Sequence, residues 1–398
     1  MFKYLILSIF LGISIGAYAA DLYVPSQYKT IQKAVNKAKT GDKIYVAPGI
    51  YKESITIKKG ISLIGINPDK CIITSSHLKN GNTIIFKGKS ANGTITGFTI
   101  TGAKGFLDRG NGILCCDGAS PVIMKNRIKG NEDSGIFSWH SSPNIIKNII
   151  SKNRCAVAFS DSDSIISNNM LLDNKFGITC SESSLTITNN TISRNSLNIG
   201  GDDSSYITIT NNLISEGKNG IGGNKSYLTI TNNTIVGNKR GGINVGNSQI
   251  IIMNNIIAKN GKNIAQNGKG ERKTRCGIDC RNSDIKGDFN CFFDNGPGIR
   301  GTQNYCLAPP KPPQPPDEPE HYIYKSHLGA NEIQKDPKFI SETDFHLKPS
   351  SPCIDRGSNK APKLPRKDKD GKERIINKRV DIGAYEYSKN NLKEDTKH

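Results

Sequence analysis

Five carboxylates recur in the middle of the chain at a spacing that could bring them together. Asp161, Glu182 and Asp203 follow one another at steps of 21 residues, and Asp163 and Asp202 lie beside them. If each step returns the chain to the same place one strand away, about 4.8 Å, these side chains form a cluster. Like charges this close need a counter-ion, and a hard cation with oxygen ligands, Ca²⁺, suits them. The alternative is a set of turn residues without metal, because turns favour Asp and Ser.

Two basic residues follow the carboxylates and are the candidate catalytic groups. Lys225 lies one coil beyond Asp203, after a step of 22 residues, and Arg240 lies about two coils beyond Asp203. Either side chain could take the proton alpha to a uronate carboxylate as a general base. The sequence alone leaves open whether they do so or are surface residues.

The single tryptophan of the chain, Trp139, lies beside Phe137 and His140. Exposed aromatic rings offer flat apolar faces on which the apolar face of a sugar can stack. Thr179 and Asn224 fall on the same predicted face and would add polar contacts. The sequence therefore predicts a sugar-binding surface; the alternative is that a loop packs over the rings and that His140 is an ordinary surface residue.

The element that must position these residues is a repeat. Steps of 23, 21, 21, 21, 22 and 22 residues separate segments that open with Gly-Ile or a close substitute. The openings are Gly112, Gly135, Ala156, Gly177, Asn198, Gly220 and Gly242. Apolar residues in each segment alternate or run in short β-branched stretches, which indicates short strands rather than helices. The sequence predicts an all-β, right-handed parallel β-helix with coils of about 21–23 residues.

Alternation within each opening strand predicts which residues face solvent. The residue after the opening glycine points inward, so the positions two and four beyond the glycine share the outer face. This outer set is Leu114 and Cys116, Phe137 and Trp139, Ala158 and Ser160, Thr179 and Ser181, Gly200 and Asp202, Gly222 and Asn224, and Asn244 and Gly246. The next position forms a further column: Asp117, His140, Asp161, Glu182, Asp203, Lys225 and Asn247.

Two columns of asparagine have a structural interpretation. Asn tolerates the left-handed conformation of tight turns, and stacked amides can hydrogen-bond from coil to coil. The first column is Asn126, Asn148, Asn169, Asn190, Asn212, Asn233 and Asn255. The second is Asn131, Asn153, Asn174, Asn195, Gly217, Asn238 and Asn260.

The ends of the chain differ from the repeats. Residues 1–19 have the layout of a cleavable signal peptide, so we expect a secreted, periplasmic or cell-surface protein without a membrane span in its mature form. Tyr28, Ile31, Val35 and Ala38 predict an amphipathic capping helix with Ser26 as its N-cap. The β-helix is expected over 20–305, a proline-rich linker or loop over 306–325, a C-terminal cap over 326–387 and a disordered tail over 388–398.

Charge and cysteine content narrow the partners. A net charge of +19 favours a polyanion, such as an acidic polysaccharide or a cell-envelope glycan, although a basic surface can also serve solubility alone. The acidic column argues against nucleic acid, which needs aromatic and basic residues along one groove. Ten cysteines fit an oxidising compartment, and five of them, beginning at Cys276, gather near the C-terminus. Their pairing stays open, and we expect a monomer.

Two terminal segments carry a resemblance to a known family. Residues 28–35, followed by Gly41-Asp and by the stretch from Val46 to Tyr51, resemble the N-terminal cap of secreted β-helix proteins of the pectin-lyase-like superfamily. Residues 336–355 and 381–387 look like the C-terminal cap of its bacterial extracellular members. The superfamily holds lyases, hydrolases, epimerases and plain binding proteins, so the resemblance predicts the fold and leaves the activity to the site.

The resemblance also suggests and excludes chemistry. Galacturonase-like enzymes carry four short motifs, of which this chain has only Asp202-Asp203; Gly220-Ile-Gly222 stands where a Gly-His-Gly would be expected. Similarity to polysaccharide lyases implies calcium that bridges protein and substrate carboxylates, with a Lys or Arg as base. We therefore expect an extracellular polysaccharide-binding or polysaccharide-modifying protein, with a calcium-dependent uronate lyase as the enzymatic form. The alternative is a non-catalytic surface, adhesion or structural β-helix.

Overall fold

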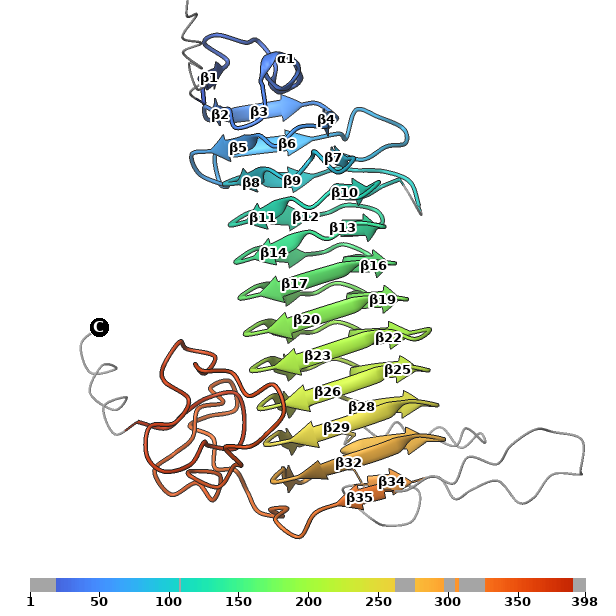
Figure 1. Cartoon of the computed structure of the whole chain (residues 1–398), viewed down its shortest axis with the longest axis vertical. Coiled ribbons are helices and arrows are strands. Elements are labelled where there is room, and N and C mark those ends of the chain that lie inside the picture. Colours follow the sequence, from blue (N-terminus) through green and yellow to red (C-terminus); the bar gives the residue numbers. More distant parts are fainter. Residues whose placement is uncertain (1–18, 107–108, 262–275, 297–304, 308–325, 389–398) are drawn as a thin grey trace, which may run out of the picture.

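The computed structural model describes residues 19–106, 109–261, 276–296, 305–307 and 326–388. Within them the chain winds into a stack of coils, each of which adds one short strand to each of three parallel sheets (Figure 1). The predicted all-β parallel β-helix is therefore confirmed. None of the described helical segments has the length and apolar character that a membrane crossing requires.

From β2 onward, every third strand along the chain falls in the same sheet, and β1 adds a further strand beside β2. Sheet A contains β1 (Asp21–Val24), β2 (Lys43–Val46), β5 (Ser62–Gly65), β8 (Thr94–Thr96), β11 (Val122–Met124), β14 (Asn144–Ile146), β17 (Asp163–Ser167), β20 (Ser184–Thr188), β23 (Tyr206–Thr210), β26 (Tyr227–Thr231), β29 (Gln249–Met253), β32 (Asp284–Asp288) and β35 (Ser326–Leu328). Sheet B contains β3 (Gly49–Lys52), β6 (Cys71–Thr74), β9 (Thr99–Thr101), β12 (Arg127–Lys129), β15 (Ile149–Ser151), β18 (Met170–Leu172), β21 (Thr191–Ser193), β24 (Leu213–Ser215), β27 (Thr234–Val236), β30 (Ile256–Ala258) and β33 (Cys291–Phe293). Sheet C contains β4 (Ile55–Ile57), β7 (Ile84–Lys87), β10 (Ile113–Cys116), β13 (Ser134–Trp139), β16 (Cys155–Ser160), β19 (Phe176–Ser181), β22 (Leu197–Asp202), β25 (Asn219–Asn224), β28 (Gly241–Gly246), β31 (Ile278–Arg281) and β34 (Tyr305–Leu307).

A short helix, α1 (Ile31–Lys37), lies at the N-terminal end of the stack (Figure 1). Its N-cap is Thr30, whose hydroxyl accepts the Lys33 N–H at 3.2 Å, rather than the predicted Ser26. The Glu53 carboxylate accepts the backbone N–H groups of the first two helical residues, Ile31 and Gln32, both at 2.9 Å. A carboxylate from the following coil thus completes the helix N-terminus, a partner that the local sequence pattern does not reveal.

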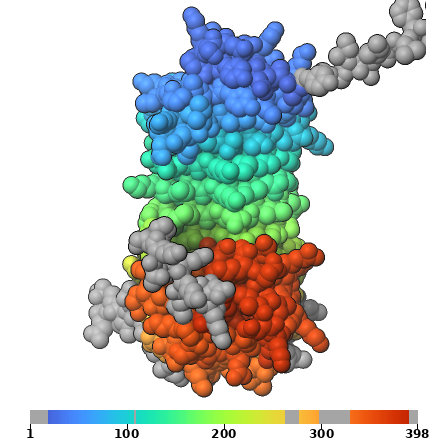
Figure 2. All heavy atoms as spheres, turned by 90° about the vertical axis from the view of Figure 1, so that its left-hand side faces the viewer, coloured from blue at the N-terminus to red at the C-terminus, as the bar shows by residue number. Residues whose placement is uncertain are grey.

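The C-terminal segment, residues 329–388, lies against the side of the stack (Figure 2). Its Ile382, Ala384 and Tyr385 form an apolar cluster with residues of sheet B such as Leu213 and Val236. The predicted cap over 326–387 is therefore not an end cover: its first residues pair in sheet A as β35, and the rest covers apolar side chains on the flank of the coils. The physical reason is that sheet B has an apolar outer face in these coils, and burying it is favourable.

The boundary between the β-helix and the proline-rich stretch lies later than predicted. Residues 306 and 307, assigned to the linker, belong to β34, which pairs with β31. The expected signal peptide, the remainder of the proline-rich stretch and the tail lie outside the described residues, apart from residues 19 and 388.

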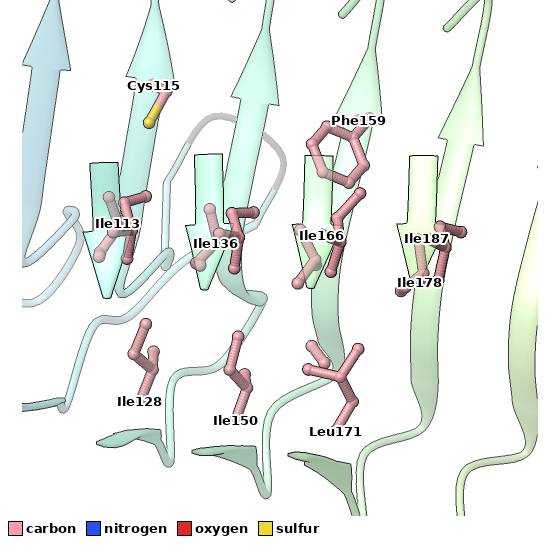
Figure 3. Close-up of a cluster of buried hydrophobic side chains, with 14 of the residues drawn as sticks. Ile113, Cys115, Ile128, Ile136, Ile150, Phe159, Ile166, Leu171, Ile178 and Ile187 are labelled. Carbon is pink, nitrogen blue, oxygen red and sulfur yellow. The ribbon is translucent and has the colours of Figure 1, made fainter. Parts of the chain in front are cut away.

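The interior is filled by columns of apolar side chains, to which most coils contribute one or two residues from each sheet (Figure 3). Ile113, Ile136 and Ile178 belong to the sheet C column, and Ile128 and Ile150 to the sheet B column; all are fully buried. Because each coil buries its apolar face mainly against its neighbours, the coils must stack in register to be stable.

Both asparagine columns form buried ladders. The Asn190 side chain shows the pattern: its Nδ2 donates to Asn212 Oδ1 at 3.0 Å, to Ile166 O at 2.8 Å and to Thr188 O at 3.0 Å. Its Oδ1 accepts the backbone N–H of Asn169 at 2.9 Å. The left-handed positions are the residues just before the ladder asparagines, for example Asn189 at φ 58°, so the ladder amides are selected by buried hydrogen bonding and not by backbone conformation.

One coil lacks a ladder asparagine and has a substitute from another position. Gly217 occupies the place in the second column, and Asn198 stands where the neighbouring coils open with glycine. Asn198 Oδ1 accepts from Asn195 Nδ2 at 2.9 Å, and its Nδ2 donates to Asn238 Oδ1 at 3.0 Å. A Cβ at Gly217 would meet Asn198 Nδ2 at 2.7 Å, so only one of the two positions can carry the amide.

At the C-terminal end of the first ladder a carboxylate takes the place of the next asparagine. Asn290 donates its backbone N–H to Glu332 Oε2 at 2.8 Å and its Nδ2 to Glu332 Oε1 at 3.1 Å. Burial raises the pKa of Glu332 to about 7, which outweighs the hydrogen bonds from Asn290 that lower the pKa.

The exchange between positions 198 and 217 can be tested directly. We expect Asn198→Gly to lower the free energy of unfolding by about 1–3 kcal/mol, because Asn195 and Asn238 lose a buried partner. The double variant Asn198→Gly/Gly217→Asn should recover most of the loss by restoring the ordinary column. Urea unfolding midpoints provide the comparison, and Ser184→Ala on the exposed face of the neighbouring coil is the control. A double variant as unstable as the sum of the two single variants would contradict this account.

A second prediction concerns pH. The folded state holds the Glu332 proton up to about pH 7, whereas the unfolded chain releases it near the ordinary value of 4.5. The folded state therefore binds more protons between these values, and this residue makes the free energy of unfolding fall as pH rises through that window. Thermal midpoints of Glu332→Gln at pH 5 and pH 8 should differ less than those of the unmodified protein. Exposed Glu342→Gln should leave the difference unchanged; an equal difference in both variants would refute the assignment.

Candidate functional site

The outer face of sheet C forms a continuous strip across six coils. We call this surface the strip. It consists of twelve outward residues in two rows, which are aligned by the pairing of β13, β16, β19, β22, β25 and β28. The rows are Phe137, Ala158, Thr179, Gly200, Gly222 and Asn244, and Trp139, Ser160, Ser181, Asp202, Asn224 and Gly246. The register predicted from alternation is confirmed in these coils, and it places Phe137, Trp139, Thr179 and Asn224 on one surface.

Three residues of the predicted outer set are not accessible. Leu114 and Cys116 in the preceding coil are buried, with exposed fractions of 9 % and 7 %, so the strip does not continue through that coil. Gly200 is also buried, because the Leu197 side chain covers it: a Cβ at Gly200 would lie 2.7 Å from Leu197 Cδ2. The accessible surface therefore narrows between Thr179 and Gly222.

The column beyond the strip is a series of left-handed turn residues, as in Asp161 at φ 46° and Glu182 at φ 50°. We call it the turn column; its members are Asp117, His140, Asp161, Glu182, Asp203, Lys225 and Asn247. A buried serine lies one or two residues after each of these turn positions in the later coils, and these serines form a ladder that the sequence analysis did not predict. Ser183 N–H donates to Ser205 Oγ at 3.3 Å, and Ser226 N–H donates to Ser248 Oγ at 3.1 Å, which fixes the position of the turn column. Turn-column side chains therefore project outward at each coil.

An aromatic and acid–imidazole group marks the N-terminal end of the strip. The Trp139 ring lies 4.7 Å from the His140 ring, centroid to centroid, and remains 45 % exposed. His140 Nδ1 contacts Asp161 Oδ2 in the next coil. This contact holds the imidazole beside the tryptophan, and because Trp139 stays half-exposed, the alternative that a loop buries it is excluded for the described residues.

The five candidate calcium ligands do not converge. Asp161 is engaged by His140, and Asp163 lies in β17 on sheet A, beyond the buried Ser162. Asp202 lies in the strip, where burial and the charge of Asp203 raise the pKa of its carboxyl. Among the described residues, no group of three or more His, Cys, Asp or Glu side chains is placed to hold one metal ion. These residues do not fit a calcium site, and calcium binding stays a prediction without structural support.

The two candidate bases lie at opposite edges of sheet C. Lys225 follows β25 and belongs to the turn column beside Asp203, whereas Arg240 precedes β28. Each of these strands has six residues, which separates the two edges by about 20 Å. Only Lys225 therefore lies near the carboxylates, and Arg240 belongs to a different set of residues.

That set is a basic column at the other edge of the strip, which the sequence reading missed. It occupies the position two residues before the opening of the later strip coils: Arg154, Lys175, Lys218 and Arg240, with Ser196 between; in the first strip coil this position is Asp133. Arg154 pairs with Asp133 at 2.9 Å, and Lys175 Nζ lies 5.4 Å from the centre of the Phe176 ring. The strip thus has a basic edge and a mainly acidic edge, a polarity that aligned repeats would have revealed.

A further aromatic pair lies around the corner on sheet A. Tyr206 and Tyr227 stack with a centroid distance of 4.5 Å and an interplanar angle of 3°. Tyr206 is 57 % exposed. Because the pair lies on another face, a substitution there is a control for substitutions of the exposed aromatic residues in the strip.

Comparisons with known proteins agree on the fold. A family model described as periplasmic copper-binding protein (NosD) matches residues 92–275, less than half of the 398-residue chain. No curated protein matches. Solved structures that match include XylC with xylose, at 11 % identity and a TM-score of 0.54, covering 74 % of this chain and 86 % of that one.

Two further structures extend the comparison. The pectate lyase Pel9A matches at 14 % identity and a TM-score of 0.52 over 94 % of this chain and 97 % of that one. The Dettilon tailspike protein matches at 13 % identity and a TM-score of 0.51 over 73 % and 69 %. Identities this low establish the fold alone. The chain is therefore a parallel β-helix protein with the pectin-lyase-like fold, as the sequence resemblance predicted.

The metal prediction has a simple test. We expect the thermal midpoint to be the same in millimolar calcium and in excess chelator, because the carboxylates of the turn column do not converge on one ion. Differential scanning fluorimetry measures both conditions. A calcium-dependent rise that Asp203→Ala abolishes would show that the site assembles on binding and would restore the calcium prediction.

Proposed function

We propose that the protein binds an acidic polysaccharide or cell-envelope glycan along the strip. The observation that carries the proposal is the alignment, on one exposed sheet face, of an open tryptophan, a floor of small polar residues and a column of basic side chains. An elongated face with one equivalent position per coil suits an elongated polymer better than a compact ligand.

Apolar stacking and polar contacts to the glycan would come from different residues of the strip. Trp139 offers a flat apolar face for a sugar ring, and Ser160, Thr179 and Ser181 beyond it are short enough to leave room for the next sugars. Asn224 is held in place by Asn247, whose Nδ2 donates to its Oδ1 at 2.8 Å, so its own Nδ2 can serve a hydroxyl or carboxylate.

Charge selects the class of glycan. The basic column would receive carboxylates or other acidic substituents, and the net charge of +19 adds long-range attraction. The carboxylates of the turn column accept hydrogen bonds from sugar hydroxyls on the opposite edge. A glycan bearing acidic groups along one side therefore fits both edges.

We place non-catalytic binding ahead of a uronate lyase. A lyase needs a metal or equivalent electrophile and a base within reach of the same sugar, whereas here the carboxylates do not converge and Arg240 lies at the far edge. A structure of XylC that contains xylose and a protein named pectate lyase share the fold, which supports carbohydrate as the ligand class without selecting an activity. A surface or adhesion role agrees with this reading.

The stacking contact can be tested with matched aromatic variants. Trp139→Ala should weaken binding to an acidic polysaccharide at least tenfold, because the sugar loses its apolar platform, about 1.4 kcal/mol or more. Tyr206→Ala removes an exposed aromatic from another face and should leave the affinity unchanged. Isothermal titration against a panel of acidic and neutral polysaccharides measures both. Equal effects of the two substitutions would place the binding surface elsewhere.

The same panel of polysaccharides tests whether the basic column contributes to binding and whether the protein has lyase activity. A Lys175→Gln/Lys218→Gln variant should bind less tightly and lose part of the salt dependence, whereas Lys29→Gln, at the N-terminal end of the chain, should do neither. Release of unsaturated uronate, followed by its ultraviolet absorbance, should stay at background. A sustained rise in absorbance would show that the protein is a uronate lyase and would contradict the assignment of non-catalytic binding.

A further inference from the structure

Two buried cysteines meet where the C-terminal segment packs on the last coils. Cys291 lies in β33 of sheet B, and Cys353 lies in the C-terminal segment; both are completely buried in the same apolar cluster. Both side chains belong to one cluster of buried side chains, and they lie close enough for the Cys291 thiol to act on the ionisation of the Cys353 thiol. In the structure both are thiols.

We propose that Cys291 and Cys353 form a disulfide in the exported protein and fasten the C-terminal segment to the coil stack. A neighbouring hydrogen bond already fixes the position of each cysteine. Cys291 Sγ lies 3.3 Å from Lys335 O, and the backbone N–H of Cys353 donates to Ser351 Oγ at 3.1 Å. Neither chain segment needs to be brought in from elsewhere to join the sulfurs.

The bond forms by exchange with an external disulfide, such as oxidised glutathione or a disulfide-bearing thiol oxidase. One cysteine thiolate attacks that disulfide and releases one reduced sulfur; the second cysteine thiolate then displaces the other. Overall, Cys291 and Cys353 lose two protons and two electrons, and the external disulfide is reduced to two thiols. Both cysteines are completely buried where the segment packs on sheet B, so the exchange takes place before the segment docks or when it opens.

The interaction with Cys291, together with burial, raises the pKa of the Cys353 thiol, which slows attack in the folded state. A protein folded in reduced form should therefore oxidise slowly with glutathione, and the rate should rise when mild denaturant opens the segment. This expectation separates a disulfide made during folding from later surface oxidation.

The disulfide would have a definite covalent consequence. It closes a loop from residue 291 to residue 353, and Cys353 is the last cysteine of the chain. Any cut between residues 308 and 325 would then leave the C-terminal segment attached through Cys353 alone. Retaining it keeps the apolar side chains of Leu213, Val236 and Ile256 covered.

Tryptic mapping without reduction reads out this pair specifically. Cys291 falls in the peptide 287–300 and Cys353 in the peptide 339–356, and each peptide has one cysteine. In protein exported to an oxidising compartment we expect the two peptides as one cross-linked species that reduction separates. Cys353→Ser should abolish the species, and Cys180→Ser should leave it intact. Recovery of both peptides as separate alkylated thiols would overturn the proposal.

A second measurement does not depend on a variant that folds. A specific protease sequence inserted after Pro316 allows the chain to be cut once between the two cysteines. After the cut, we expect one band in a denaturing gel without reductant and two bands with reductant. Two bands in both lanes would overturn the proposal even if Cys353→Ser failed to fold.

Discussion

The fold depends on the burial of polar groups at the corners of the coil. Each corner turns the backbone sharply, and its peptide groups point into an interior that is shielded from solvent. Side-chain amides of the asparagine columns and hydroxyls of the serine column supply the partners, each bonded to the coil above or below. A ladder of this kind tolerates no change of register, because a shifted coil would leave several buried groups without a partner at once.

This constraint explains why the outer face is ordered enough to carry a site. The ladders align successive coils residue by residue, so an outward position in one coil lies beside its equivalent in the next. Columns of Trp139, Ser160 and Ser181, or of Lys175 and Lys218, are therefore consequences of the interior hydrogen bonds. The one irregular coil shows how strong the requirement is: Asn198 supplies the amide that Gly217 cannot, and the column on the surface continues without a shift.

Much of the fold could be predicted because repetition and alternation are local signals. Stepping the chain by 21 to 23 residues gave the inward column of Ile136 and Ile178, the ladder residues and the outward register. What escaped depends on contacts between distant segments. Glu53 at the helix N-terminus and Glu332 at the end of the ladder are examples, because nothing near either residue marks its partner.

The site was predicted in part for the same reason. Sequence spacing brought Asp161, Glu182 and Asp203 into one column, but spacing does not show that His140 engages Asp161 or that turn side chains diverge. It grouped Arg240 with the carboxylates by counting coils and neglected the position within the coil, which places Arg240 at the far edge. Reading the position two residues before each coil opening would have found the basic column.

The central claim, that the strip is the glycan-binding face, is tested most directly by the fluorescence of the protein's single tryptophan. Trp139 lies in the strip and is 45 % exposed, so the signal reports from this face without a substitution. Titration with an acidic polysaccharide should shift the emission and protect the indole from quenching by acrylamide, with less protection as salt concentration rises. Saturating binding that leaves both the emission and the quenching unchanged would show that the glycan binds elsewhere.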